Sequence, residues 1–186
     1  MNRRAAFVLT ALTLLASTPA LAQELWPAMS NSFFGRSSQS PIPRTTVSVD
    51  ASFRPGTILV NTAERRLYLF LGNGQALRYG IGVGRDGFRW SGVHRITAKK
   101  EWPEWTPPSQ MLRRRPDLPR HMKGGEDNPL GARAMYLGST LYRIHGSNEP
   151  ETIGTAVSSG CFRMTNDDVI DLYDRVPVGA TVIVQN

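Results

Sequence analysis

The sequence has 186 residues, and its 22 Lys and Arg residues outnumber its 15 Asp and Glu residues, giving a formal net charge of +7. This length supports one domain with a substantial hydrophobic core but leaves little room for a second. The single cysteine rules out an intramolecular disulfide, so the fold cannot rest on a framework of disulfide bridges.

The first residues, 1–22, are typical of a secretory signal peptide. Arg3 and Arg4 form a basic start, an apolar run covers residues 5–16, and Ala20-Leu21-Ala22 has the small-x-small pattern of a cleavage site. The apolar run is shorter than the roughly 20 residues that span a bilayer, although an uncleaved signal anchor is the alternative. We therefore expect a periplasmic, cell-wall-associated protein. There the positive charge favours an anionic wall or membrane partner rather than nucleic acid.

Residues 23–55 contain many Ser, Asn, Gln and Pro residues and show no sustained hydrophobic period. Such a composition predicts a flexible tether, here with one short strand near Thr46–Val49. The folded domain is predicted to cover residues 56–186.

This domain is predicted to be mainly β, because short strands follow one another with turn residues between them. Leu67, Leu69 and Leu71 keep the two-residue alternation of a half-buried strand. Gly72-Asn73-Gly74 predicts a hairpin turn, since glycine and asparagine tolerate positive φ. The predicted strands are Thr57–Asn61, Arg66–Leu71, Gln75–Val83, His94–Glu101, Arg133–Leu137, Leu141–His145 and Ala180–Gln185.

One helix is indicated near the end of the chain. Thr165 and Asp168 form a capping box, and Pro177 and Gly179 follow the helix and end it. The apolar residues of one face are Val169, Ile170, Leu172, Tyr173 and Val176. We therefore predict a β-sandwich or partly closed barrel with one or two short helices.

Two features of the long connection after residue 101 have more than one interpretation. Trp102 and Trp105, beside prolines, either line a substrate groove or cover the β core. Residues 109–132 form a strongly basic, loop-like insertion, which either covers the active site, meets anionic wall polymer or is a solvated surface.

The single cysteine, Cys161, is the candidate nucleophile. An unpaired thiol in an exported protein indicates a reactive group or an intermolecular bridge, the alternative being a small buried hydrophobic residue. Gly160 permits a close backbone approach beside the thiol. His145 closes the preceding strand, and an imidazole within hydrogen-bond reach can remove the thiol proton. Backbone N–H groups around Gly160 and Cys161 are candidates for holding an oxyanion.

The wider pattern around these residues resembles the signature of the YkuD-type L,D-transpeptidases. The matching motif residues are His145-Gly146, Ser158-x-Gly160-Cys161-x-Arg163-Met164 and Asn166. Similar segments also occur at Ile58–Leu71, Asp127–Gly131 and Val178–Val182. The resemblance covers residues 56–184 and leaves the tether outside it.

The resemblance implies a cysteine acyltransferase that needs no cofactor and acts in peptidoglycan biosynthesis and cell shape. Family members attack the bond between a diamino acid and the terminal D-alanine of a stem tetrapeptide, hold the stem as a thioester and pass it to an amine. Carbapenems mimic the reactive acyl centre. By position, Cys161 is the nucleophile, and His145 is the general base, oriented by a carbonyl of the Gly146 region. The substrate-binding and oxyanion residues implied are Gly146, Ser158, Ser159, Gly160 and Arg163.

Several site positions leave alternatives open. Many family members have histidine two residues before the cysteine, where this chain has Ser159, which puts any role of a second imidazole in doubt. Arg163 either holds a substrate carboxylate through its fork of donors or anchors the cysteine loop. We expect no metal site, because no Cys-x-x-Cys or His-x-x-x-His spacing is present, and His94 and His121 are interpreted as incidental.

The favoured acyl acceptor is the diamino acid of a second stem peptide, which gives a 3→3 crosslink. The same site can instead pass the acyl group to water, as an amidase or carboxypeptidase does, or to an amine of an outer-membrane protein. A non-catalytic wall-binding module is disfavoured because Cys161, His145 and Gly160 are all present. Chain order and spacing of the His, Cys and Arg residues disfavour sortases and NlpC/P60 endopeptidases.

Overall fold

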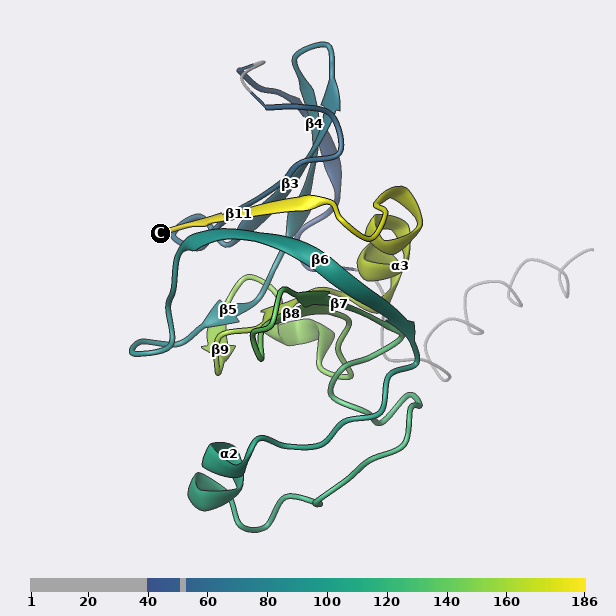
Figure 1. The fold of residues 1–186 in the computed structure, drawn as a ribbon. Helices are drawn as coiled ribbons and strands as arrows, with labels where there is room; N and C mark the ends of the chain where they lie inside the picture. The colour runs from purple at the N-terminus through teal and green to yellow at the C-terminus, as the bar shows by residue number, and fades with distance from the viewer. Residues whose placement is uncertain (1–39, 51–52) are drawn as a thin grey trace, which may run out of the picture. The chain divides into compact units, whose positions relative to one another are not determined.

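The computed structural model describes residues 40–50 and 53–186 (Figure 1). The predicted signal peptide, 1–22, and residues 23–39 and 51–52 of the predicted tether lie outside the described residues. Within the described part, the prediction of a mainly β fold with two short α-helices is confirmed. The strands are β1 (Thr45–Ser48), β2 (Ile58–Asn61), β3 (Arg66–Gly72), β4 (Gln75–Gly80), β5 (Val83–Gly84), β6 (Gly92–Glu101), β7 (Arg133–Leu137), β8 (Arg143–His145), β9 (Ala156–Ser158), β10 (Phe162–Arg163) and β11 (Thr181–Gln185).

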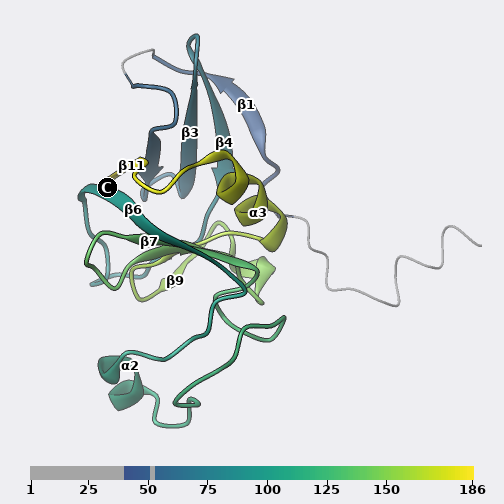
Figure 2. The same cartoon turned by 45° about the vertical axis from the view of Figure 1, so that its right-hand side comes forward.

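Nine of these strands form one sheet in the order β1-β4-β3-β2-β11-β6-β7-β8-β10, and β5 pairs separately with β9. The last strand, β11, lies in the middle of the sheet, parallel to β2 and antiparallel to β6. Figures 1 and 2 show that the strands on the two sides of β11 run in different directions, β3 and β4 across β6 and β7. The closing strand of the sequence therefore joins the amino-terminal hairpin to the strands that carry His145 and Cys161.

The predicted hairpin turn is confirmed at Gly72-Asn73-Gly74, where all three residues have positive φ. Leu67 and Leu69 are buried as the alternation predicts, but Leu71 is 42% exposed and Phe70 is buried in its place. The reason is an irregularity in the β3–β4 pairing between Phe70 and Gly72, which shifts the side-chain alternation by one residue.

The short strand predicted near Thr46–Val49 is present as β1, Thr45–Ser48, which pairs with β4. Three of its four residues are exposed. Arg44, just before β1, bridges to Asp168 and Asp171 at 3.5 and 3.1 Å. Residues before position 56 therefore belong to the folded domain.

The predicted return strand Gln75–Val83 is two elements, β4 and β5. The last residue of β4 is Gly80, where there is no room for a side chain, because a Cβ there would lie 2.6 Å from Cβ of Ile42. After Gly80 the chain leaves the β3–β4 pairing, and Gly82 exchanges backbone hydrogen bonds with Arg163, both at 2.9 Å. This change of partner brings β5 beside the segment that contains Cys161.

Two α-helices and one 3₁₀ turn complete the described fold: α2 (Ser109–Arg114), η1 (Pro150–Thr152) and α3 (Asn166–Arg175). The predicted helix is confirmed as α3, with Oγ1 of Thr165 accepting from N–H of Asp168 at 3.3 Å. Val169, Leu172 and Val176 are buried, whereas Ile170 and Tyr173 are only half-buried. Only two residues separate β10 from α3, so the helix fixes the end of the segment that contains Cys161.

Helix α2 lies inside the insertion that was predicted to be loop-like. It has six residues, none of which is buried, and its two apolar residues, Met111 and Leu112, are adjacent, so the sequence shows no helical period. Figures 1 and 2 show the insertion extending beyond β7 on the side where β9 lies.

Candidate active site

The pairing of three short strands brings the predicted catalytic residues to one face of the sheet. In β8 and β7, His145 lies opposite Ala134 and Arg143 lies opposite Tyr136. In β10, Arg163 lies beside His145, and Phe162 lies beside the buried Ile144. Because side chains alternate along a strand, Arg143, His145, Arg163 and Cys161, which directly precedes β10, share the face opposite the core.

His145 is buried, with 4% of its surface exposed, and its ring is held by the next residue in the chain. Nδ1 lies 2.6 Å from the carbonyl oxygen of Gly146. A carbonyl can only accept, so Nδ1 carries the hydrogen and Nε2 keeps its lone pair. Burial, reinforced by the charges of Arg163 and Arg143, lowers the pKa of His145 to about 3 despite the Gly146 hydrogen bond. The imidazole is therefore neutral at neutral pH and free to take up a proton.

Gly146 is itself fixed by Asn166, the first residue of α3. A Cβ at Gly146 would overlap Oδ1 of Asn166, which also accepts from N–H of Ala132 at 2.9 Å. The N–H of Gly146 donates to the carbonyl of Arg133 at 3.0 Å. Asn166 appeared in the sequence motif without a role, and its side chain now accounts for the absence of any larger residue at position 146.

The Cys161 thiol is partly buried, and its Sγ lies 3.7 Å from the carbonyl oxygen of Leu141. Burial raises the pKa of Cys161, and the nearby Arg143 and Arg163 oppose this rise in part. The thiol is therefore protonated at neutral pH. Burial therefore favours the uncharged forms of both Cys161 and His145.

Ser158 closes the turn that carries the thiol. Its Oγ donates to the carbonyl of Cys161 at 2.6 Å and accepts from N–H of Gly160 at 3.1 Å. The N–H of Gly160, predicted as an oxyanion donor, therefore already has a partner in Oγ of Ser158. The N–H of Cys161 remains from the predicted pair. Ser159 is half-buried, and no hydrogen bond of its side chain is found within the described part of the chain.

Two aromatic residues that sequence reasoning missed hold the other side of this turn. Nε1–H of Trp90 donates to the carbonyl of Gly160 at 2.8 Å. The ring of Tyr142 stacks on Trp90, with centroids 4.4 Å apart and planes 10° apart. Gly160 has φ of +109°, and a Cβ there would lie 2.5 Å from Cε1 of Tyr142. No local motif marks Trp90. It lies 71 residues before Cys161 in the sequence and reaches the cysteine turn only in the folded chain.

Known proteins resemble this chain in sequence and in fold. The family profile described as the L,D-transpeptidase catalytic domain matches residues 55–184. The chain belongs to this family. A probable L,D-transpeptidase of Escherichia coli, ErfK/SrfK, is 40% identical over 154 residues, which cover 78% of this chain and 48% of that protein. This chain thus spans about half the length of that relative.

Two further relatives extend the comparison. A putative L,D-transpeptidase of Fuscovulum blasticum is 32% identical over 98% of this chain and 96% of its own length. The solved catalytic domain of an E. faecium L,D-transpeptidase, acylated by ertapenem, covers 69% of this chain and 95% of that domain, with a TM-score of 0.54 and 18% identity. At that identity the likeness establishes the L,D-transpeptidase fold alone.

Within this L,D-transpeptidase fold, Arg163 is engaged with the protein itself. Its Nη1 lies 2.8 Å from Oε2 of Glu149 and 3.5 Å from Oγ1 of Thr152. Together with the backbone pair to Gly82, these contacts anchor the segment after Cys161. Of the two interpretations left open for Arg163, the geometry favours the anchor.

The basic insertion reaches the neighbourhood of the cysteine turn through Phe88. Arg114 of α2 and Arg85 both lie over the ring of Phe88, with Cζ 5.1 and 4.6 Å from the ring centroid. The carbonyl oxygen of Phe88 lies near Gly160, 3.4 Å from the position of a Cβ there. The insertion is therefore connected to the site through one aromatic residue.

The two tryptophans after residue 101 differ in their surroundings. Trp105 is buried and pairs with Met122, while Trp102 is 43% exposed. His94 meets the edge of Trp90, and His121 lies 3.3 Å from Oγ1 of Thr106.

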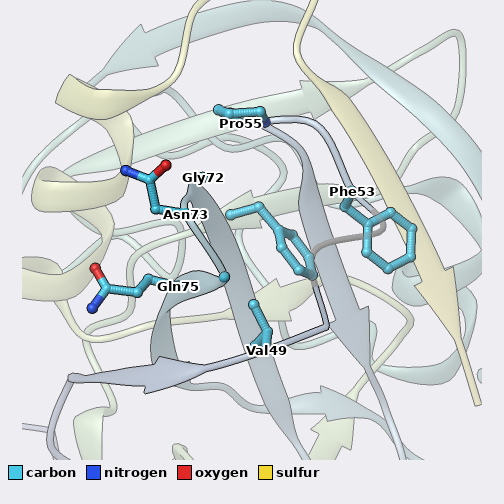
Figure 3. Close-up of a pocket in the computed structure, with 8 residues that line it drawn as sticks. Val49, Phe53, Pro55, Gly72, Asn73 and Gln75 are labelled. Atoms are coloured by element: carbon cyan, nitrogen blue, oxygen red, sulfur yellow. The ribbon is translucent and has the colours of Figure 1, made fainter.

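Other candidate sites were sought within the described residues. They hold no cluster of three His, Cys, Asp or Glu side chains that could bind a metal, and no helix long and apolar enough to cross a membrane. A hollow elsewhere in the domain is lined by Val49, Phe53, Pro55, Phe70 and the β3–β4 turn (Figure 3). None of the predicted site residues lines it.

Proposed function

We propose that this chain is a peptidoglycan L,D-transpeptidase in which Cys161 is the nucleophile and His145 the general base. The observation that carries the proposal is the register of β8 and β10, which sets Arg163 beside His145 and so puts Cys161 on the same face as His145. Nδ1 of His145 is fixed by the carbonyl of Gly146, which leaves Nε2 free to accept a proton. Membership of the family supplies the reaction class, and the position of the two residues supplies their roles.

In the acylation step, Sγ of Cys161 attacks the carbonyl carbon between the diamino acid and the terminal D-alanine. The thiol proton passes to Nε2 of His145 as the S–C bond forms. His145 then gives the proton to the departing nitrogen, the C–N bond breaks, and D-alanine leaves. The stem remains bound as a thioester.

In the second step, an amine attacks the thioester carbonyl, its proton passes through His145 to Sγ, and the thiol is regenerated. Holding that amine beside the thioester is worth about 7–11 kcal/mol of the barrier, so the residues on the acceptor side select the product. We favour the diamino acid of a second stem. Water and an amine of an outer-membrane protein are the alternative acceptors.

The test supplies disaccharide tetrapeptides as the sole substrate and identifies products by mass spectrometry. A crosslinked dimer with loss of D-alanine supports transpeptidation. Accumulation of tripeptide alone favours hydrolysis, and stem linked to added envelope protein favours anchoring. His145→Gln should abolish product formation, whereas the matched variant His94→Gln should not, because His94 contacts the site only through the edge of Trp90.

We also propose that residues 1–22 are removed during export and that the protein acts in the periplasm. The basic start, the apolar run and Ala20-Leu21-Ala22 support this proposal. Amino-terminal sequencing of the cellular protein should begin near Gln23. Recovery of Arg3 in most of the cellular pool would contradict it.

A further inference from the structure

Two arginines lie beside the proposed nucleophile, and they differ in what they contact. Arg163 is paired with Glu149 at 2.8 Å, so a carboxylate of the protein already occupies its guanidinium. Arg143 makes no ion pair with any carboxylate of the described residues. The charge of Arg143 is therefore the one available to a ligand at this face.

The guanidinium of Arg143 is held in place before any ligand binds. Its Cζ lies 5.1 Å from the ring centroid of Tyr136, its cross-strand partner on β7. Nη1 donates to the carbonyl of Leu141 at 3.1 Å, and Sγ of Cys161 lies 3.7 Å from the same oxygen. A single carbonyl thus positions both the thiol and the guanidinium.

The donors of Arg143 are not all used within the protein. Nε is buried and has no hydrogen-bond partner among the residues that the structure describes. Buried donors are normally satisfied, and leaving one unpaired costs about 1–3 kcal/mol. An unpaired N–H on a held guanidinium beside a thiol suggests that the partner arrives with the substrate.

The chemistry of a stem tetrapeptide offers such a partner. The leaving residue ends in a carboxylate, and standard bond lengths place its carbon within about 4 Å of the scissile carbonyl carbon. Sγ must approach that carbonyl carbon to about 3–3.5 Å before attack. Nη1 of Arg143 and Sγ of Cys161 contact the same carbonyl oxygen, so the guanidinium is within reach of a carboxylate near the scissile bond. Arginine binds carboxylates through paired N–H donors.

We propose that Arg143 binds the terminal carboxylate of the donor stem peptide and so restricts the enzyme to donors that end in a free carboxylate. This proposal rests on the proposed function, because it uses Cys161 as the attacking group. The same charge also favours the thiolate form of Cys161. The experiment must therefore separate recognition of the donor from activation of the thiol.

The experiment compares two donors that differ only at the leaving residue, a tetrapeptide ending in D-alanine and the same peptide ending in D-alaninamide. Acylation of Cys161 is followed by intact-protein mass spectrometry over a range of donor concentrations. For the wild-type chain we expect acylation efficiency with the free carboxylate to exceed that with the amide by about 10- to 100-fold. In Arg143→Met that preference should disappear, through a rise in the apparent KM for the carboxylate donor. Arg143→Lys, which keeps the charge but not the fork, should give an intermediate preference.

The matched control is Arg66→Met, because Arg66 lies on β3 and four strands separate β3 from β8 in the sheet. It should keep the full preference. Alkylation of Cys161 by iodoacetamide and the melting temperature report thiol reactivity and folding in every variant. If Arg143→Met slows both donors by the same factor, Arg143 acts only on the thiol and the proposal is overturned.

The two proposals fail in different ways. If wild-type protein forms a thioester with neither donor, the proposed function fails. If it forms the thioester equally well with both donors, the proposed function stands and the carboxylate role of Arg143 is refuted.

Discussion

Gly160 offers the sharpest prediction about how the nucleophile is positioned. Its φ of +109° lies in the region that side chains with a Cβ avoid, and a non-glycine residue held there costs about 1–3 kcal/mol. A Cβ at this position would also lie 2.5 Å from Cε1 of Tyr142. The Tyr142 ring cannot easily retreat, because it stacks on Trp90 at 4.4 Å. Overpacking of this kind costs about another 1–3 kcal/mol.

Gly160→Ala should therefore lower the stability of the domain by about 2–6 kcal/mol and displace the cysteine turn. Each kcal/mol lowers Tm by about 2–4 °C in a domain of this size, so thermal unfolding resolves the change. The matched control is Gly179→Ala, since Gly179 also has positive φ, +93°, but has nothing within 4 Å of its Cβ position. The difference in stability loss between the two variants gives the cost of the overlap with Tyr142.

A second variant separates strain from overlap. Adding Tyr142→Leu to Gly160→Ala should recover the overlap part of the loss and leave the φ strain. Acylation of Cys161 by a carbapenem, measured by mass spectrometry, should fall at least about 10-fold in Gly160→Ala alone. Gly160→Ala that melts and acylates no worse than Gly179→Ala would refute the view that Trp90 and Tyr142 fix this turn.

Four further predictions concern the same site and its support. Trp90→Phe should lower the rate of Cys161 acylation by about 10-fold, because the carbonyl of Gly160 loses the indole donor. Mass spectrometry of the acylated protein over time measures this rate. Because the pKa of His145 is held at about 3, carbapenem acylation should not decline with a midpoint near pH 6.5. The raised pKa of Cys161 should make its alkylation by iodoacetamide still accelerate above about pH 9. Thr165→Ala removes the cap of α3 and should lower the free energy of unfolding by about 0.5–2 kcal/mol in urea titrations.

The sequence predicts most of the strands because their signals are local. The β3–β4 turn and the capped helix α3 follow from glycine, asparagine and threonine at defined positions, and both are confirmed. Helix α2 was missed because none of its residues is buried and they show no apolar period. The pairing of β1 with β4 depends on partners elsewhere in the fold.

Some residues of the candidate site could likewise be predicted from local sequence, and others could not. Cys161, His145 and Ser158 could be named from a short motif. Trp90 and Arg143 could not, because their contacts depend on the register of β7, β8 and β10 and on the path of the chain before β6. The use of the Gly160 N–H by Ser158 is likewise a matter of side-chain geometry that no spacing encodes.

The most direct test of the central claim is the mass of the protein after incubation with a stem tetrapeptide. Wild-type chain should gain the mass of the stem without its terminal D-alanine, and proteolysis should place that adduct on the peptide containing Cys161. Cys161→Ala should gain nothing and release no D-alanine. Release of D-alanine by Cys161→Ala at the wild-type rate, or an adduct on any other residue, would contradict the account.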